Sequence, residues 1–319
     1  MKKLLVQLTY FFIPIFIFIL IIEICFRIAP TTYALKKDNL LKNKSKIEIL
    51  ILGNSQAAYG INPDFIDLYS FNIANVSQSL YFDKRITLKH IEQLPKLKYI
   101  LINLEFHSLS FSSQKARDYW SYYDFDIEYK NDMSIFTKTY RTLGYTPTVL
   151  LSYAIKRSKK DNICIDFDSP YTFINNKEKG SLLFDGPEVD AFKIKTLQNT
   201  LNDFQKTITL SKEKVEVMAD LNDFIAQLKL KNITPILITT PVYKTYFNLY
   251  NKKLLTDFNK SVFAIANKNK LEYWNYLNLD LQESDFLNGN HLNKVGAAKY
   301  SKILNKRINE LQVAANTKI

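Results

Sequence analysis

A serine follows a short apolar run that predicts a buried strand. Residues 47–52 are Ile-Glu-Ile-Leu-Ile-Leu, a pattern typical of a parallel strand, and Gly53-Asn54-Ser55 comes directly after them. In parallel α/β folds the carboxyl edge of the sheet is the usual ligand site, so Ser55 would lie where a hydroxyl could attack a carbonyl. Nearby N–H groups would hold the oxyanion that forms. The motif alone leaves open a second interpretation, in which Ser55 only caps the next helix.

A histidine lies near the other end of the chain, just before the last predicted helix at residues 294–312. The chain has 3 histidines, and His291 belongs to the glycine-containing segment Asp285–Asn293, with the sequence DFLNGNHLN. Imidazole has a pKa near neutrality and is the natural base for a serine hydroxyl. The sequence therefore predicts that Ser55 and His291 meet at one sheet edge, although the histidine by itself could be a surface-loop residue.

The elements between these two segments alternate between strands and helices. Further strands are predicted at residues 71–74, 99–104, 233–241 and 271–276, and helices at residues 83–94, 201–230 and 250–268. This rhythm predicts an α/β fold with a parallel sheet covered by helices, a three-layer α/β/α sandwich. Aromatic and polar residues 108–200 interrupt the rhythm. They are predicted to be an insertion, either a lid or substrate platform or irregular packing around the core.

The N-terminal segment is apolar enough to enter a membrane. Residues 4–22 are apolar except for Gln7 and Thr9, and about 20 such residues span a bilayer. We expect one transmembrane anchor over residues 1–30, a lysine-rich linker over residues 31–46 and the α/β domain over residues 47–312. A cleaved signal peptide is the alternative, but Thr32-Tyr33-Ala34 is a poor cleavage site.

The charges that flank this segment do not decide its orientation. Lys2 and Lys3 precede it, and a larger number of lysines and arginines follow it, which favours a cytoplasmic C-terminal domain. A very short N-terminal tail, however, usually stays inside. The charge count therefore leaves both orientations open.

Composition excludes several classes of function. The chain has 319 residues, of which 47% are hydrophobic, and this is enough for one large domain. Its net charge of +12 indicates either an anionic partner or a codon bias toward lysine. The sequence has no nucleic-acid-binding motif and no metal-ligand spacing, and Cys25 and Cys164 are not expected to pair. We therefore expect no nucleic acid, no metal and no cofactor.

Taken together, the two end segments resemble the SGNH hydrolase superfamily. The segment at residues 47–63, which contains ILILGNSQAAYGINP, resembles its first conserved block, and DFLNGNHLNKVGA, at residues 285–297, resembles its last. The segment FNIANVSQSLYFD, at residues 71–83, resembles the membrane-anchored envelope branch. That branch includes D-alanyl-lipoteichoic acid transfer and alginate O-acetylation proteins. The resemblance covers roughly residues 45–310.

The resemblance implies a flavodoxin-like three-layer fold and serine chemistry on acyl esters. Ser55 would take the acyl group after His291 removes its proton. The domain would be extracytoplasmic, on a single-pass protein of the cytoplasmic membrane. An acyl donor and an envelope polysaccharide or related polymer would be its partners, with a membrane acyltransferase as a further candidate. Transfer and hydrolysis differ only in which hydroxyl attacks the acyl-enzyme, so both are expected.

Two parts of the motif depart from the superfamily pattern. The triad acid usually lies three residues before the histidine, where this chain has Asn288. Three arrangements stay open: Asp285 reaches His291, Asn288 orients the ring through its amide oxygen, or a Ser-His dyad works with backbone help. Loss of the acid can cost orders of magnitude in rate, so a non-catalytic glycan-binding or assembly protein is the alternative function.

The second departure concerns the oxyanion hole. Its donors in the superfamily are the N–H of the nucleophile, a glycine and an asparagine. The N–H of Ser55 and the backbone of Ser77 and Gln78 are the best candidates here, and His107 could contribute. Asn54, which replaces the usual aspartate beside the nucleophile, is a further candidate for this side of the site.

Overall fold

The computed structural model describes residues 2–112, 121–127, 134–143, 148–158, 163–166, 169–172 and 179–316. The chain divides into two compact units. The first combines Met1–Leu35 with Lys115–Thr172, and the second combines Lys36–Gln114 with Phe173–Ile319.

The second unit contains a parallel sheet of five strands. They are β1 (Ile49–Leu52), β2 (Ser70–Asn72), β3 (Tyr99–Asn103), β6 (Thr234–Thr239) and β7 (Tyr273–Asn275). Their order is β2-β1-β3-β6-β7, which is the flavodoxin-like order of a doubly wound sheet. Every residue of β1 is buried, as expected for a strand with helices on both of its faces.

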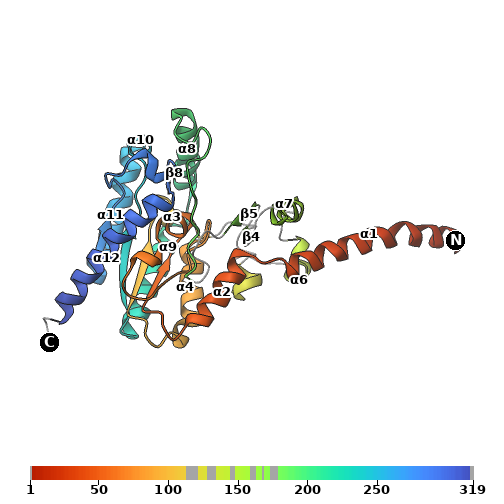
Figure 1. The fold of residues 1–319 in the computed structure, drawn as a ribbon, viewed down its shortest axis with the longest axis horizontal. Coiled ribbons are helices and arrows are strands. Elements are labelled where there is room, and N and C mark those ends of the chain that lie inside the picture. Colours follow the sequence, from red (N-terminus) through yellow and green to blue (C-terminus); the bar gives the residue numbers. More distant parts are fainter. Residues whose placement is uncertain are drawn as a thin grey trace. The chain divides into compact units, whose positions relative to one another are not determined.

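Two groups of helices cover this sheet. In one group α4 packs on α9 and α9 packs on α11, and in the other α12 packs on α3. The three-layer α/β/α architecture predicted from the sequence is therefore confirmed (Figure 1). The helices of this unit are α3 (Ser55–Gly60), α4 (Leu80–His90), α8 (Ile194–Leu210), α9 (Lys214–Leu230), α10 (Lys244–Asn248), α11 (Lys252–Asn269) and α12 (Lys294–Asn316).

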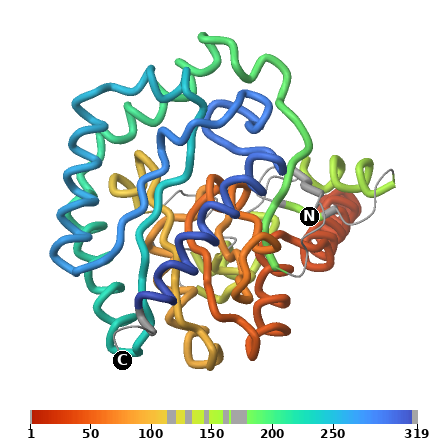
Figure 2. Tube along the Cα trace, turned by 60° about the vertical axis from the view of Figure 1, so that its left-hand side comes forward, coloured from red at the N-terminus to blue at the C-terminus, as the bar shows by residue number. Residues whose placement is uncertain are grey.

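The two ends of the second unit lie side by side. Helix α12, blue in Figure 2, runs beside the orange helix α3 that follows β1. Helix α12 is amphipathic, and its buried Ala297, Tyr300, Leu304 and Ile308 recur at intervals of three and four residues. This packing brings the segment before α12 close to the segment after β1.

Short 3-10 turns lie at η1 (Pro63–Phe65), η2 (Ile91–Gln93), η3 (Ser108–Ser110) and η5 (Glu283–Asp285).

The N-terminal apolar segment forms one continuous helix, α1 (Lys2–Ile28). Its most apolar 18-residue window has a mean hydropathy of 2.6, and none of that window is buried. It is the one helix in the described part of the chain that is long and apolar enough to cross a membrane.

The lysine-rich residues expected to form an irregular linker are largely helical. Helix α2 (Thr32–Asn43) begins where the Thr31 hydroxyl accepts a hydrogen bond from the Ala34 N–H, a normal N-terminal cap. Leu40 is buried, and the buried Lys36 donates to the carbonyl of Ala74. A cap and a buried face make this polar segment helical, although its charges suggested a solvated connection.

The rest of the first unit comes from the segment expected to be an insertion. It contains α6 (Ile135–Thr139), η4 (Arg141–Leu143), α7 (Thr148–Arg157) and an antiparallel pair of strands, β4 (Ile163–Asp166) and β5 (Ser169–Thr172). Residues 173–200, which were expected to belong to the same insertion, are part of the second unit. Tyr119 and Tyr129, two of the aromatic residues of this segment, lie outside the described residues.

Candidate active site

Ser55 occupies the first position of α3, directly after the sharp turn that ends β1. Gly53 makes this turn with φ of +133°, and a Cβ there would lie 2.8 Å from the Cβ of Asn103. Asn54 caps the helix, because its side-chain oxygen accepts from the Gln56 N–H at 3.2 Å. The capping role considered for Ser55 therefore belongs to Asn54. The same hydrogen bond occupies the side-chain oxygen of Asn54, which was itself a candidate for the oxyanion site.

The Ser55 hydroxyl contacts His291, which is 236 residues further along the chain. Ser55 Oγ lies 2.8 Å from His291 Nε2. The histidine is held by a small hairpin of β8 (Phe286–Asn288) and β9 (His291–Leu292). At its turn a Cβ on Gly289 would lie 2.5 Å from Leu197, so only glycine fits without a shift of that side chain. The hairpin and the helix α3 thus position the two groups for proton transfer.

The other ring nitrogen of His291 contacts Asn288. The distance between His291 Nδ1 and Asn288 Oδ1 is 3.0 Å, and Asn288 Nδ2 donates to Glu188 Oε2 at 3.0 Å. A carboxylate only accepts hydrogen bonds, so Glu188 keeps the NH₂ end of the amide on its side and the oxygen toward the ring. The amide oxygen also only accepts, so the ring proton lies on Nδ1 and Nε2 is free to accept the Ser55 proton.

Asp285, one of the two candidates for the triad acid, does not contact His291 in this structure. Its carboxylate oxygens lie 2.7 and 2.9 Å from Lys299 Nζ, and one of them accepts from the Gln282 N–H at 3.1 Å. Asp285 ends the 3-10 turn η5, and its side chain folds back to cap that turn. These bonds hold the carboxylate at the base of α12, so the arrangement with Asp285 on His291 is not found, and Asn288 takes the position beside the ring.

The imidazole of His291 lies in an apolar surrounding. The ring of Tyr59 packs against it with a centroid distance of 5.0 Å, and Phe184 packs on Tyr59 at 4.7 Å. Burial lowers the pKa of His291 to about 4. Its Nδ1 partner is a neutral amide, which cannot stabilise the imidazolium as a carboxylate would. At neutral pH the ring is uncharged and can accept a proton.

Ser77 and Gln78, the candidate oxyanion donors after β2, have other roles in the structure than the expected ones. The Gln78 N–H donates to the carbonyl of Asn75 at 3.1 Å, and its side chain donates to Asp83 Oδ1 at 2.7 Å. Gln78 is therefore committed to this turn, which corrects its expected role. Ser77 takes the left-handed conformation with φ of +55° at the same turn. Burial raises the pKa of Asp83 to about 7, and its Oδ1 also accepts from the Gly53 N–H.

His107 is confined by aromatic rings. Its ring stacks on Phe204 at 4.3 Å and on Phe111 at 5.2 Å, and Nδ1 lies 3.6 Å from Glu105 Oε2. Burial lowers the pKa of His107 to about 3. His107 is therefore an uncharged residue packed between aromatic rings. It makes no contact with Ser55 that would support its expected role as an oxyanion donor.

Two further groups beside the nucleophile were missed as site residues. Glu105 is buried, and its Oε1 accepts from the N–H of Gln56, the residue after Ser55, at 3.2 Å. Burial raises its pKa well above the ordinary value. Asn75 is fully buried, its N–H donates to the Gly53 carbonyl, and neither polar atom of its side chain has a hydrogen-bond partner among the described residues. The sequence offered one signal for Glu105 and Asn75: they follow β3 and β2, and both strands end at the sheet edge where Ser55 lies.

Glu188 was also missed, and no sequence pattern pointed to it. It lies 100 residues before Asn288, and its N–H donates to the carbonyl of Leu287 in β8. This backbone bond brings its carboxylate to the Asn288 amide. Among the described residues, no group of three or more histidine, cysteine or acidic side chains could hold a metal ion.

Comparisons with known proteins add little to this geometry. No family model matches the chain, and no curated protein matches it. Among solved structures, a Bacteroides fragilis protein whose proposed activity is that of an acylhydrolase is similar over 88% of this chain and 95% of its own. The TM-score is 0.41 and the sequence identity is 11%. This similarity is too remote to assign an activity, so the function is argued from the site itself.

Proposed function

We propose that this chain is a serine-dependent enzyme that transfers or hydrolyses acyl esters, with Ser55 as the nucleophile and His291 as its base. The observation that supports this most directly is the 2.8 Å distance between Ser55 Oγ and His291 Nε2, with Nδ1 of the same ring held by Asn288. A serine whose hydroxyl contacts an oriented, uncharged imidazole is the arrangement that nucleophilic catalysis requires.

In the proposed reaction, Ser55 Oγ attacks the carbonyl carbon of an acyl ester while His291 Nε2 accepts the hydroxyl proton. The tetrahedral intermediate collapses when the bond to the leaving alcohol breaks and His291 returns its proton to that oxygen. This leaves an acyl-serine. A second hydroxyl, from a polymer or from water, then gives its proton to His291 and attacks the acyl-serine, and Ser55 regains its proton as the product leaves.

Asn288 has a positioning role in this proposal. Its oxygen fixes the ring and the tautomer, which is half of what an aspartate supplies. It does not carry the negative charge that stabilises the imidazolium during the reaction, and the low pKa of His291 agrees with that lack. We therefore expect an enzyme that forms its acyl-serine slowly compared with a carboxylate triad.

We also propose that Asn75 supplies an oxyanion donor. Its backbone N–H bonds the carbonyl of Gly53, in the turn that presents Ser55, and neither of its polar side-chain atoms has a partner in the described part of the chain. A buried amide without a partner costs about 1–3 kcal/mol, and an oxyanion would satisfy its NH₂ group. The N–H of Ser55 is the second proposed donor, as the sequence suggested.

The substrate and location follow from the sequence resemblance and from α1. We propose that α1 anchors the chain in the cytoplasmic membrane with the second unit on the extracytoplasmic side. The acceptor would then be an envelope polysaccharide or related polymer, and the acyl donor would be a membrane-associated ester or thioester. A membrane acyltransferase is the proposed supplier of that donor.

Labelling with a fluorophosphonate tests the chemistry. The full chain, in membranes, is treated with a fluorophosphonate probe, whose phosphorus is attacked by an activated serine oxygen with loss of fluoride. We expect labelling at Ser55 that Ser55→Ala abolishes and His291→Gln strongly slows, whereas Ser261→Ala, in α11, whose hydroxyl bonds only the carbonyl of Asp257 one turn earlier, leaves it unchanged. Failure of the intact protein to react, together with saturable binding of an envelope polymer, would instead favour the non-catalytic glycan-binding alternative.

A further inference from the structure

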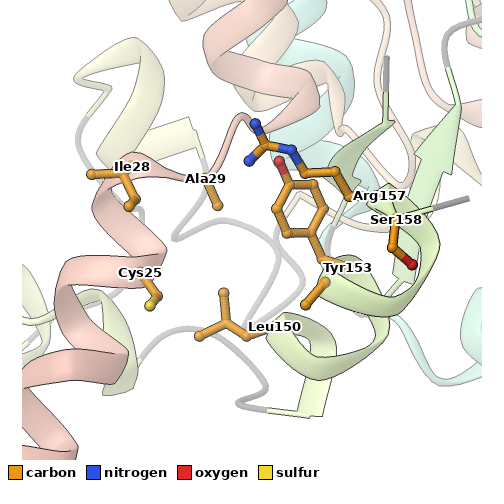
Figure 3. A pocket seen from close by; sticks show the side chains of 8 residues that line it. Cys25, Ile28, Ala29, Leu150, Tyr153, Arg157 and Ser158 are labelled. Atoms are coloured by element: carbon orange, nitrogen blue, oxygen red, sulfur yellow. The ribbon is translucent and has the colours of Figure 1, made fainter. Parts of the chain in front are cut away.

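The first unit contains a pocket next to the end of the apolar helix. Its volume is about 490 Å³, and it lies between α1 and α7. Cys25, Ile28 and Ala29 line one side of it, and Leu150, Tyr153 and Arg157 line the other. In Figure 3 the Arg157 guanidinium and the Tyr153 hydroxyl lie side by side above the apolar part of the lining. The guanidinium carbon is 5.9 Å from the centre of the Tyr153 ring.

The position of the pocket along α1 places it at the depth of lipid headgroups if α1 spans a bilayer. The unbroken apolar stretch ends at Ile22, and Cys25 and Ile28 lie three and six residues further along the same helix. A helix rises 1.5 Å per residue, so these residues lie about 5 to 9 Å beyond the hydrocarbon core. Headgroup regions are about that thick.

The elements near this end of α1 are tied to it by hydrogen bonds. The N–H groups of Arg141 and Thr142 donate to the Glu23 carboxylate at 3.1 and 2.9 Å, and Arg27 Nη2 donates to the carbonyl of Thr139 at 2.6 Å. Helix α6 and the turn η4 are therefore held at the same depth as residues 23–27. Their location at the membrane interface follows from that of α1.

This part of the first unit exposes large apolar side chains. Phe136 is 65% exposed and Leu151 is 67% exposed, and Ile28, Ile135, Leu143 and Ile155 are also exposed. Soluble surfaces seldom gather so many large apolar side chains, whereas the acyl boundary of a bilayer covers them. Ile28 belongs to α1 itself, and Leu143 belongs to η4, which packs on α1, so exposed apolar residues of this unit adjoin the proposed membrane helix and favour lipid as their cover.

We propose that the pocket between α1 and α7 binds one anionic phospholipid of the membrane. The phosphate would lie against the Arg157 guanidinium and the Tyr153 hydroxyl, and the upper acyl chain would lie against Leu150, Ala29 and Cys25. Among the described residues that line the pocket, Arg157 carries the only charge, and no described carboxylate pairs with it. A planar guanidinium next to a hydroxyl suits the oxygens of a phosphate diester.

This inference rests on α1 staying in the membrane, and it does not depend on the acyl chemistry of Ser55. Resistance of the full chain to alkaline carbonate extraction tests the anchor separately. Release of the intact chain by carbonate would overturn the lipid proposal at its premise and leave the serine chemistry untouched. Loss of fluorophosphonate labelling, in contrast, would overturn the proposed reaction and leave the lipid site standing.

Native mass spectrometry of the delipidated full chain tests the site itself. The protein in detergent is titrated with phosphatidylglycerol and, separately, with phosphatidylethanolamine of the same chains. We expect one phosphatidylglycerol to bind preferentially and Arg157→Gln to weaken its binding about tenfold, because a charge-assisted bond is lost. Lys156→Gln is the matched control, since it removes the same charge from the neighbouring residue, which does not line the pocket.

A second variant separates the pocket from the charge. Ala154 lines the pocket, and Ala154→Trp would fill it while Arg157 stays in place. We expect Ala154→Trp to reduce binding of phosphatidylglycerol with an unchanged melting temperature of the protein. Equal binding of both lipids, or full binding by both Arg157→Gln and Ala154→Trp, would overturn the proposal.

Discussion

The histidine side and the oxyanion side of Ser55 use their polar atoms in opposite ways. On the histidine side, each group has a partner, from Ser55 through His291 and Asn288 to Glu188. On the proposed oxyanion side, the side-chain amide of Gln78 donates to Asp83, whereas the side-chain amide of Asn75 has no partner among the described residues. The comparison teaches that the contact between Ser55 and His291 is preformed, whereas Asn75, the proposed oxyanion donor, would gain its side-chain partner only when an anion binds.

The largest effect should come from breaking the histidine side. Ser55→Ala and His291→Ala are each expected to lower the rate of ester hydrolysis by about 10,000-fold or more, because the two groups act as one unit. The double variant should be no slower than either single variant. Hydrolysis of a p-nitrophenyl acyl ester by the purified full chain measures this, and additive losses would contradict a shared role.

The next largest effect should come from the oxyanion side. Asn75→Ala is expected to lower kcat by about 100- to 1000-fold, which is the usual cost of a lost oxyanion donor. Because the Asn75 side chain has no partner among the residues that the structure describes, its loss should leave the free energy of unfolding unchanged or raise it.

Gln78→Ala gives the contrast for this prediction. Its side chain binds Asp83, so the variant should lower the free energy of unfolding and change kcat much less than Asn75→Ala. Urea denaturation together with steady-state kinetics separates the two residues. A normal kcat in Asn75→Ala would remove this residue from the oxyanion site.

A negative charge introduced beside the His291 imidazole should raise the activity. In the double variant Asn288→Asp, Glu188→Gln, a carboxylate would face His291 Nδ1 without a second carboxylate next to it. We expect a rise in kcat of about tenfold or more, since the imidazolium is stabilised. Asn288→Asp alone should gain less, because Glu188 would repel the new charge.

The pH profile reports the same change. Burial holds the pKa of His291 at about 4, and only the neutral ring can accept a proton, so kcat/KM should be flat at neutral pH and fall as pH drops through about 4. In the double variant the anion raises this pKa, so the acid limb moves to higher pH. An acid limb already near 6.5 in the unaltered protein would contradict the buried, uncharged surrounding.

The smallest effect should come from the outermost member of the histidine side. Glu188→Ala removes the acceptor of the Asn288 NH₂ group, while the Asn290 N–H still donates to the Asn288 oxygen at 3.3 Å, so only a fraction of the molecules should flip the amide and shift His291 to the other tautomer. Because Glu188 is partly exposed to solvent, we expect only about a fivefold loss in kcat. The ¹⁵N chemical shifts of the His291 ring should report the mixed tautomers. Glu188→Gln keeps an acceptor oxygen and should therefore retain part of the tautomer preference of the unaltered protein.

The elements of the second unit could be predicted because their patterns are local. The apolar runs at β1, β3 and β6 and the three- and four-residue spacing of α12 appear in the sequence itself and correspond to buried faces in the structure. Helix α2 was not predicted, because its stability depends on a cap at Thr31 and on a buried face that lysines obscure. The two-unit division was also missed, since it depends on contacts between distant segments.

For the site, the sequence by itself determined the residue types at two sheet-edge positions: a serine after β1 and a histidine before α12. It did not decide between Asp285 and Asn288, because both precede His291 by a few residues and the hairpin geometry selects one. The tertiary structure alone decided that Asp285 pairs with Lys299 and that Glu188, from 100 residues away, holds the Asn288 amide. Hydrogen bonds depend on distances of tenths of an ångström, and only the packing of hairpin, loop and helix sets those distances.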